Sequence, residues 1–158
     1  MSDTVQELLR NFANSQARSV KAKDPKVVTA TLTDDCRRFI LPASFMRGMG
    51  IPQELIEAGS SNEQYEQHIA MQIPFIESTS CEIHDTTFDS EKRKATVYVT
   101  HRIKLFSIEE EYLVENLILV DLDESGGKIK KVLEFTDPLE AKRYMTKIQE
   151  LAAAKQEE

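Results

Sequence analysis

Through most of the second half of the chain, apolar and polar residues alternate, which is the pattern of β-strands with one buried face. The alternation predicts strands over residues 79–88 and 94–106, joined by a turn at residues 89–92. Residues 109–137 keep the same period and predict a long hairpin with its turn at residues 124–127. Four strands joined by short turns indicate an antiparallel meander.

A helical period marks three other segments. One face of apolar residues predicts a helix over residues 4–23, which Asp24 and Pro25 end. A second helix, capped by Ser60, Ser61 or Asn62, is predicted to run to about residue 72, and a third starts with Asp137 as N-cap and Pro138 in its first turn. Residues 36–42 predict a short strand. Residues 43–61 have no sustained period and are interpreted as a loop with one helical turn at residues 52–56.

The order of these elements predicts an α+β fold, with helices on one face of a curved antiparallel sheet. The 158 residues show no internal repeat and no linker, so a single domain over residues 1–158 is expected, with residues 152–158 as a frayed tail. Residues 117–120 are apolar on both strand faces, which predicts cover on both sides of the sheet. The helices are one cover, and a second subunit is the simplest other, so we expect a homodimer through the sheet.

The charge and composition of the chain argue against several classes of binding partner. The net charge of −7, the pI near 5.1 and the absence of a basic block argue against nucleic acid and anionic membranes. No apolar run approaches the roughly 18–20 residues that a bilayer requires. Cys36 and Cys81 fit a reducing, cytoplasmic location better than a disulfide framework. With three scattered histidines and no Cys-x-x-Cys, we expect neither a metal site nor a cofactor.

Polar residues interrupt the apolar faces of the predicted hairpin. Tyr112 and Asn116 leave their strand on one face, and Glu134 lies on the apolar face of the return strand. Burying such groups without partners costs about 1–3 kcal/mol each. The pattern therefore predicts that these side chains line a pocket, unless a β-bulge near Glu115 exchanges the two faces.

An arginine is also expected inside. Arg37 and Arg38 lie on opposite faces of a short strand that is apolar on both, so one of them needs a carboxylate or a ligand oxygen. A structural ion pair explains this as well as a binding site does. His101 falls on an apolar face, as a general base or as a hydrogen-bonded core residue. His68 falls on a helix, where a lone histidine is more often structural.

Four short stretches carry a resemblance to a known family. They are Thr33–Pro42 (TDDCRRFILP), Asn62–His68 (NEQYEQH), Glu115–Asn116 (EN) and Lys131–Asp137 (KVLEFTD). With the order of elements, they resemble the small fungal SnoaL-like proteins of the nuclear transport factor 2-like superfamily. The resemblance implies a cone-shaped α+β barrel with a pocket between sheet and helices, often dimeric. It assigns functional roles to Arg38 and Glu134 and to the segment from Tyr112 to Asn116. Many members have a tyrosine where this chain has Asn116.

Members of that family in fungal natural-product pathways are typically cofactor-free cyclases or isomerases. The resemblance thus predicts an acid–base rearrangement or ring closure of a bulky secondary metabolite, such as a semipinacol-type shift or an epoxide opening. Arg38, Tyr112 and Glu134 are the predicted catalytic residues, and residues 43–58 are expected to cover the ligand. The predicted substrate-binding residues are Asn116, His101, His68 and Tyr65. The alternatives are a hydro-lyase and a non-catalytic binding module in which Arg38 and Glu134 form a buried ion pair.

Overall fold

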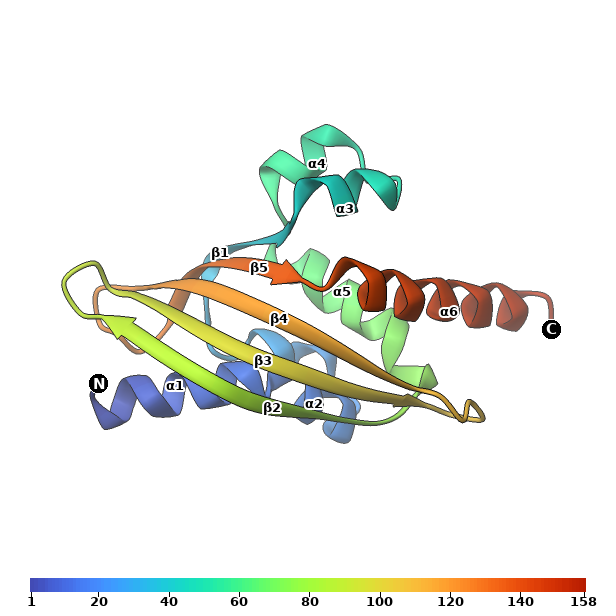
Figure 1. Cartoon of the computed structure of the whole chain (residues 1–158), viewed down its shortest axis with the longest axis horizontal. Helices are drawn as coiled ribbons and strands as arrows, with labels where there is room; N and C mark the ends of the chain where they lie inside the picture. The colour runs from blue at the N-terminus through green and yellow to red at the C-terminus, as the bar shows by residue number, and fades with distance from the viewer.

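The computed structural model describes residues 1–158 and is built on a five-stranded, strongly curved sheet (Figure 1). The strands are β1 (Leu32–Leu41), β2 (Ile76–Asp89), β3 (Lys94–Leu105), β4 (Glu111–Leu122) and β5 (Ile129–Thr136), in the order β1-β5-β4-β3-β2. Strands β2 to β5 form the predicted antiparallel meander. Strand β1 is longer than predicted and pairs with β5 in parallel, so the sheet is not purely antiparallel.

Six α-helices accompany the sheet: α1 (Asp3–Ala13), α2 (Ser15–Ala22), α3 (Ala43–Gly48), α4 (Gln53–Ala58), α5 (Asn62–Gln72) and α6 (Pro138–Gln156). The short 3-10 helices η1 (Pro25–Thr29) and η2 (Ile73–Phe75) precede β1 and β2. Helix α5 ends at the predicted residue, Ser61 is its N-cap among the three candidates, and Asp137 caps α6 as predicted. None of the helices is both long and apolar enough to cross a bilayer.

Three helical predictions differ from the structure. The predicted helix over residues 4–23 is two helices, because the backbone of Asn14 leaves helical geometry and its side-chain amide donates to the Arg10 carbonyl. Residues 43–61, interpreted as a loop, contain α3 and α4. Helix α6 continues to Gln156, through most of the segment that was expected to fray.

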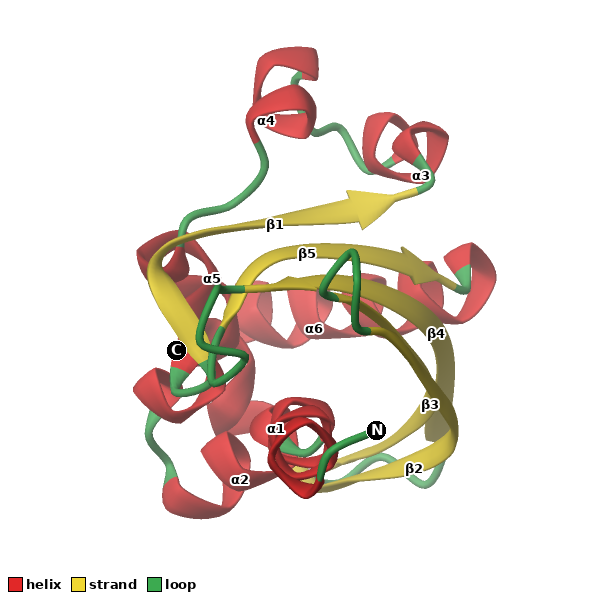
Figure 2. Ribbon diagram, turned by 90° about the vertical axis from the view of Figure 1, so that its left-hand side faces the viewer, coloured by secondary structure: helices red, strands yellow, loops and turns green.

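The sheet wraps around α1, α2 and α6, with α5 closing its open side (Figure 2). Two apolar clusters fill the concave side. The first packs α1 against Ala95, Val97, Val99 and Ile118, and the second packs α6 against Ile103, Leu105 and Tyr112. Each fully buried large apolar side chain contributes about 1.5–3 kcal/mol to folding. The alternation of the sequence thus predicted the buried face of β3 and β4.

Candidate active site

A line of polar side chains crosses the concave face between the two apolar clusters. On β3, His101 lies between Val99 of the first cluster and Ile103 of the second. On β4, Asn116 likewise lies between an apolar residue of the first cluster and one of the second. Both side chains are more than nine-tenths buried. The polar line therefore divides the core at its centre.

The strand registers extend this line to Glu134 and Arg38. His101 pairs with Val114, two residues before Asn116, and Asn116 pairs with Thr136, two residues after Glu134. Glu134 in turn pairs with Ile40, two residues after Arg38. Each residue of the series is thus offset by two positions from the direct partner of the one before, which makes the two diagonal neighbours. In antiparallel pairs such neighbours are about 7–8 Å apart, within reach of long side chains. Four strands bring together His101, Asn116, Glu134 and Arg38, hereafter the polar line.

Arg38 and Glu134 form a buried ion pair, with Arg38 Nη1 3.1 Å from Glu134 Oε2 and side-chain exposures of 6% and 13%. Arg38 is thus the inward-facing arginine that the short strand required. Its guanidinium also lies over the Tyr65 ring, 3.8 Å from the ring centroid. The parallel pairing of β1 with β5 is what places the two charges on one face.

Helix α5 supplies the other side of the site. Its start is fixed by a capping box in which Ser61 and Gln64 satisfy each other's backbone N–H groups. Tyr65 and His68 follow one turn apart, with ring centroids separated by 6.4 Å. Burial raises the pKa of Tyr65, so its phenol remains a donor. The outer side of His68 is exposed, while desolvation of its ring lowers its pKa, which Glu134 raises and Arg38 lowers further.

Two buried polar atoms of the line have no partner in the protein. Arg38 Nε and Asn116 Oδ1 make no hydrogen bond to backbone or side chain. Buried polar groups almost always have a hydrogen-bond partner, and an unpaired one costs about 1–3 kcal/mol. A donor and an acceptor are therefore available on the concave face for a bound molecule.

The structure does not bring Tyr112 to the polar line. Tyr112 and Asn116 share a face as predicted, but four residues of strand separate them by about 13 Å. The Tyr112 ring belongs to the second apolar cluster, 5.5 Å from the Tyr144 ring, with the guanidinium of Arg143 4.2 Å from its centroid. Tyr65 is the phenol beside Arg38. The catalytic role predicted for Tyr112 has no support in this geometry.

The sequence also missed a buried polar pair, in which the Tyr144 hydroxyl donates to Gln72 Oε1 at 2.6 Å. Gln72 lies in helical phase with Tyr65 and Ile69, and this was the available signal that its side chain faces inward. That residues 43–58 cover the ligand stays a prediction; Phe45 of this segment packs against the second apolar cluster. Helices α3 and α4 stand beyond the β1 edge, away from α1 and α2 (Figure 2).

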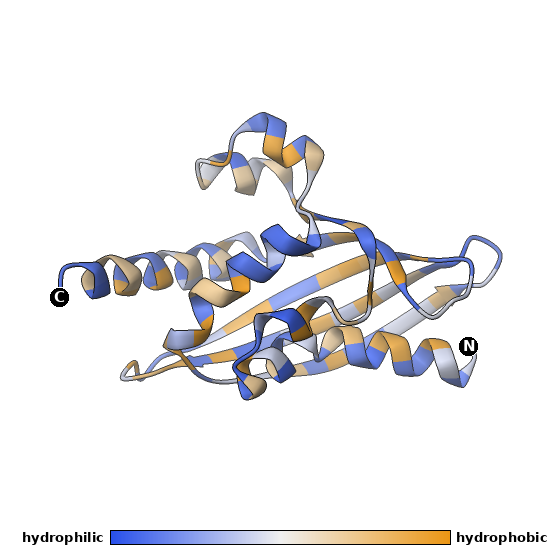
Figure 3. Ribbon diagram, turned by 180° about the vertical axis from the view of Figure 1, so that it is seen from behind, coloured by the Kyte–Doolittle hydropathy of each residue, from blue (hydrophilic) through white to orange (hydrophobic).

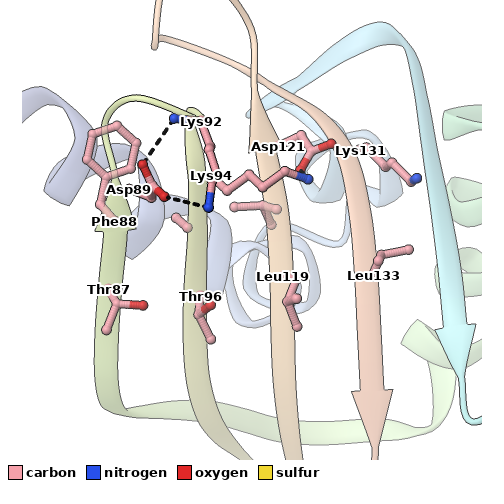
Figure 4. Close-up of a pocket in the computed structure, with 12 residues that line it drawn as sticks. Thr87, Phe88, Asp89, Lys92, Lys94, Thr96, Leu119, Asp121, Lys131 and Leu133 are labelled. Carbon is pink, nitrogen blue, oxygen red and sulfur yellow. Dashed lines mark hydrogen bonds and ion pairs between the residues drawn. The ribbon is translucent and has the colours of Figure 1, made fainter.

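Two surface hollows lie outside the polar line. One, of about 390 Å³, crosses the outer face of β2 to β5 (Figure 4), and the other, of about 410 Å³, lies beside α6 and Tyr112. No three His, Cys, Asp or Glu side chains gather in a way that could hold a metal ion. Burial raises the pKa of both Cys36 and Cys81 to about 11, so their thiols stay protonated at neutral pH.

The burial of His101 predicts that the folded protein loses stability as the pH falls. Burial lowers its pKa, Glu134 raises it and Arg38 lowers it further, with a net fall below the ordinary value. Below pH about 6.5, the unfolded chain therefore binds a proton that the folded chain rejects. Its contribution to stability is complete above that pH and is lost toward pH 5, by at most about 1.4 kcal/mol per pH unit.

Urea unfolding at several pH values measures this effect. We expect His101→Gln to flatten the dependence between pH 6.5 and 5. Parallel curves for wild type and His101→Gln would contradict the burial argument.

Comparison with known proteins gives matches in structure only. No protein-family model matches the chain, and no curated protein matches it in sequence. BvnE pinacolase from Penicillium brevicompactum superposes with a TM-score of 0.70 at 17% identity, over 94% of this chain and 99% of that one. AusH from Aspergillus nidulans matches at 0.67 and 16% identity, over 87% and 86%. PrhC from Penicillium brasilianum matches at 0.67 and 16% identity, over 98% and 93%.

A protein from Burkholderia pseudomallei described as ntf2-like matches with a TM-score of 0.59 at 14% identity, over 90% of this chain and 97% of that one. This chain has the nuclear transport factor 2-like cone fold. The predicted α+β cone, with a curved, unclosed sheet around helices, is thereby confirmed. Within the cone, the polar line occupies the concave wall and α5 faces it.

Proposed function

We propose that the protein is a cofactor-independent isomerase or cyclase that performs an acid–base rearrangement at the polar line. The observation that carries this proposal is the Arg38–Glu134 pair on the concave wall, beside a free Arg38 Nε–H donor and a free Asn116 amide oxygen. In a purely structural ion pair, the buried polar atoms around it would have hydrogen-bond partners. Arg38 Nε and Asn116 Oδ1 have none, which favours a reaction site. The structural likeness to a pinacolase supports the same class of chemistry.

In this proposal, Glu134 accepts a proton from the substrate. Arg38 binds Glu134 through Nη1, which leaves its Nε–H to donate to a substrate oxygen that gains negative charge. Fixed donors aimed at developing charge stabilise the transition state strongly in a water-poor site. One guanidinium thereby holds the base and stabilises the oxyanion.

A semipinacol-type shift fits these positions. A substrate epoxide opens as its oxygen receives hydrogen bonds from Arg38 and the protonated Tyr65. A carbon substituent migrates to the carbon that loses the C–O bond. Glu134 removes the proton of the neighbouring hydroxyl as that oxygen becomes a carbonyl. The proton finally returns to the opened oxygen, so the product is an isomer of the substrate.

The residues beside the polar line set the character of the substrate. Val99 and Ile103 flank His101 on β3, and Val114 and Ile118 flank Asn116 on β4. We propose an apolar skeleton with few oxygens, because the residues around the polar line are apolar and Asn116 Oδ1 offers a free acceptor to one hydroxyl. His101, neutral at pH 7, and His68 then contact the same molecule.

Mass spectrometry of a reconstituted reaction tests the proposal. Purified protein is incubated with metabolite extract from a strain of the source organism that lacks the gene. An isomerase converts one compound into another of equal mass, whereas a hydro-lyase forms a product that has lost one water. An extract that protein leaves unchanged, while a compound is retained by the protein on dialysis, would replace the proposal by a binding module.

A further inference from the structure

Strand β2 carries a buried hydroxyl that the proposed reaction does not use. Thr79 pairs with Ile103, a buried residue of the second apolar cluster, and direct cross-strand partners share a face of the sheet. Its neighbours Ser78 and Ser80 are exposed on the other face. Two residues further along β2, Cys81 packs against the first apolar cluster. Thr79 therefore lies on the concave face, between the two clusters.

Thr79 continues the polar line by one more strand. Its partner on β3 lies two residues after His101. Every earlier step of the polar line has the same offset of two positions, toward the same end of the sheet. Strands of a sheet that curves toward closure are tilted and staggered, so residues at one height around its axis are offset from strand to strand. The polar line and Thr79 thus form one layer around the cone, hereafter the polar layer.

The Thr79 hydroxyl has no partner in the protein. Its Oγ1 atom is buried and makes no hydrogen bond, as is true of Arg38 Nε and Asn116 Oδ1. Thr31 Oγ1 is the only other side-chain atom of this kind, and Thr31 precedes β1. Figure 3 shows this side of the sheet, with hydrophilic segments between hydrophobic ones along the strands. Buried polar groups almost always have a partner, so the polar layer offers hydrogen bonds that the chain itself does not satisfy.

Thr79 and Asn116 are too far apart to bind one oxygen atom. Two diagonal steps separate them, which amount to about 15 Å along the wall and less across its concave side. His101 lies between them and is neutral at pH 7, because burial lowers its pKa. A hydroxyl beside a neutral imidazole cannot balance a charge, so a group bound there is neutral. Thr79 thus suits a hydroxyl, carbonyl or ether oxygen distinct from the one at Asn116.

We propose that Thr79 binds a second, neutral oxygen of the substrate, remote from the oxygen that reacts at Arg38. The substrate is then a rigid apolar skeleton of more than one ring, with oxygen at two separate positions. This inference rests on the proposed function for the reacting end, and it adds the residue that selects the far end. Thr79 holds the substrate in one orientation along the wall and takes no part in bond breaking.

Removing the Thr79 hydroxyl is expected to stabilise the free protein. Thr79→Val keeps the β-branched shape and replaces the unpaired hydroxyl by a methyl group, so we expect the urea midpoint to rise by roughly 0.5 M. Thr31→Val is the matched control, because Thr31 Oγ1 is also buried and unpaired but lies outside the polar layer. A lower midpoint for Thr79→Val would show that water or the protein already satisfies this hydroxyl, and it would overturn the proposal.

Binding from a metabolite extract tests the far contact directly. The Glu134→Gln chain, which is expected to bind without turnover, is dialysed against extract from the strain that lacks the gene. Mass spectrometry measures the compound that the chain retains. Adding Thr79→Val is expected to raise the half-saturating concentration of extract about 3–10-fold, which corresponds to the loss of one neutral hydrogen bond. Adding Thr79→Ser, which keeps the hydroxyl, or Thr31→Val should change it by less than about twofold.

The exact mass of the retained compound should show more than one oxygen. Equal retention by the Thr79→Val chain, a retained compound with a single oxygen, or no retained compound would each overturn the proposal. Turnover by the wild-type chain is measured separately. A compound that is retained but not converted would remove the isomerase function and leave the role of Thr79 in binding unchanged.

Discussion

Replacement of Glu134 by glutamine is expected to lower turnover by about 10²–10⁴-fold, the usual contribution of a general base. Glutamine has nearly the same shape and its carbonyl oxygen still accepts from Arg38 Nη1, which is 3.1 Å from Glu134 Oε2 in the native chain. The amide cannot take a proton from the substrate. The fold should therefore survive while the reaction fails, and circular dichroism with single-turnover kinetics measures both.

Glu115→Gln is the matched control for this substitution. Glu115 lies on the outer face of β4, where its carboxylate accepts from the Tyr98 hydroxyl at 2.8 Å. Loss of that surface interaction is expected to change turnover little. A Glu134→Gln enzyme within a few-fold of wild type would remove Glu134 from the mechanism, above all if Arg38→Lys behaved the same way.

Arg38→Met is expected to be the most destabilising single substitution at the site, by about 2–4 kcal/mol. It leaves the Glu134 carboxylate, only 13% exposed, without its counter-ion and removes the cation from the Tyr65 ring. For a chain of this length, the loss corresponds to a fall in Tm of roughly 10 °C. Thermal and urea unfolding of the purified variant measure it.

The double variant Arg38→Met with Glu134→Leu shows whether the loss comes from the stranded charge. With both charges gone, apolar side chains fill the space, and we expect less than about half of the loss seen for Arg38→Met alone. The double variant should still have no activity. Equal losses in both variants would mean that Arg38 stabilises the fold through packing rather than through its charge.

Much of the site could be predicted from alternation alone. Strand period fixes which residues share a face, so alternation by itself predicts that Asn116, Glu134 and His101 lie on the apolar face of their strands. The two-arginine strand required one arginine inside, and Arg38 is the one that faces Glu134. Strand β4 pairs with β3 without a register shift, and its one irregularity, against β5 between Asp121 and Leu122, lies beyond Asn116, so the predicted faces of Tyr112 and Asn116 hold.

Depth along a strand and the position of separate elements were harder to predict. Tyr112 shares a face of β4 with Asn116 but lies at another place along the strand, in the second apolar cluster. Alternation shows which face a residue is on, but not which other elements it meets along the strand. The parallel pairing of β1 with β5 depends on contacts far apart in sequence. Helices α3 and α4 bury no residue, so they leave no apolar period to read.

The central claim is that Glu134 acts as the base of a skeletal rearrangement, and one metabolite comparison tests it most directly. A strain lacking the gene is complemented with wild type, Glu134→Gln or Glu115→Gln, and the products are compared by mass spectrometry and NMR. We predict that deletion changes the skeleton or diastereomer ratio of one product, and that wild type and Glu115→Gln restore it while Glu134→Gln does not. Equal restoration by all three genes, or a deletion without effect, would contradict the claim.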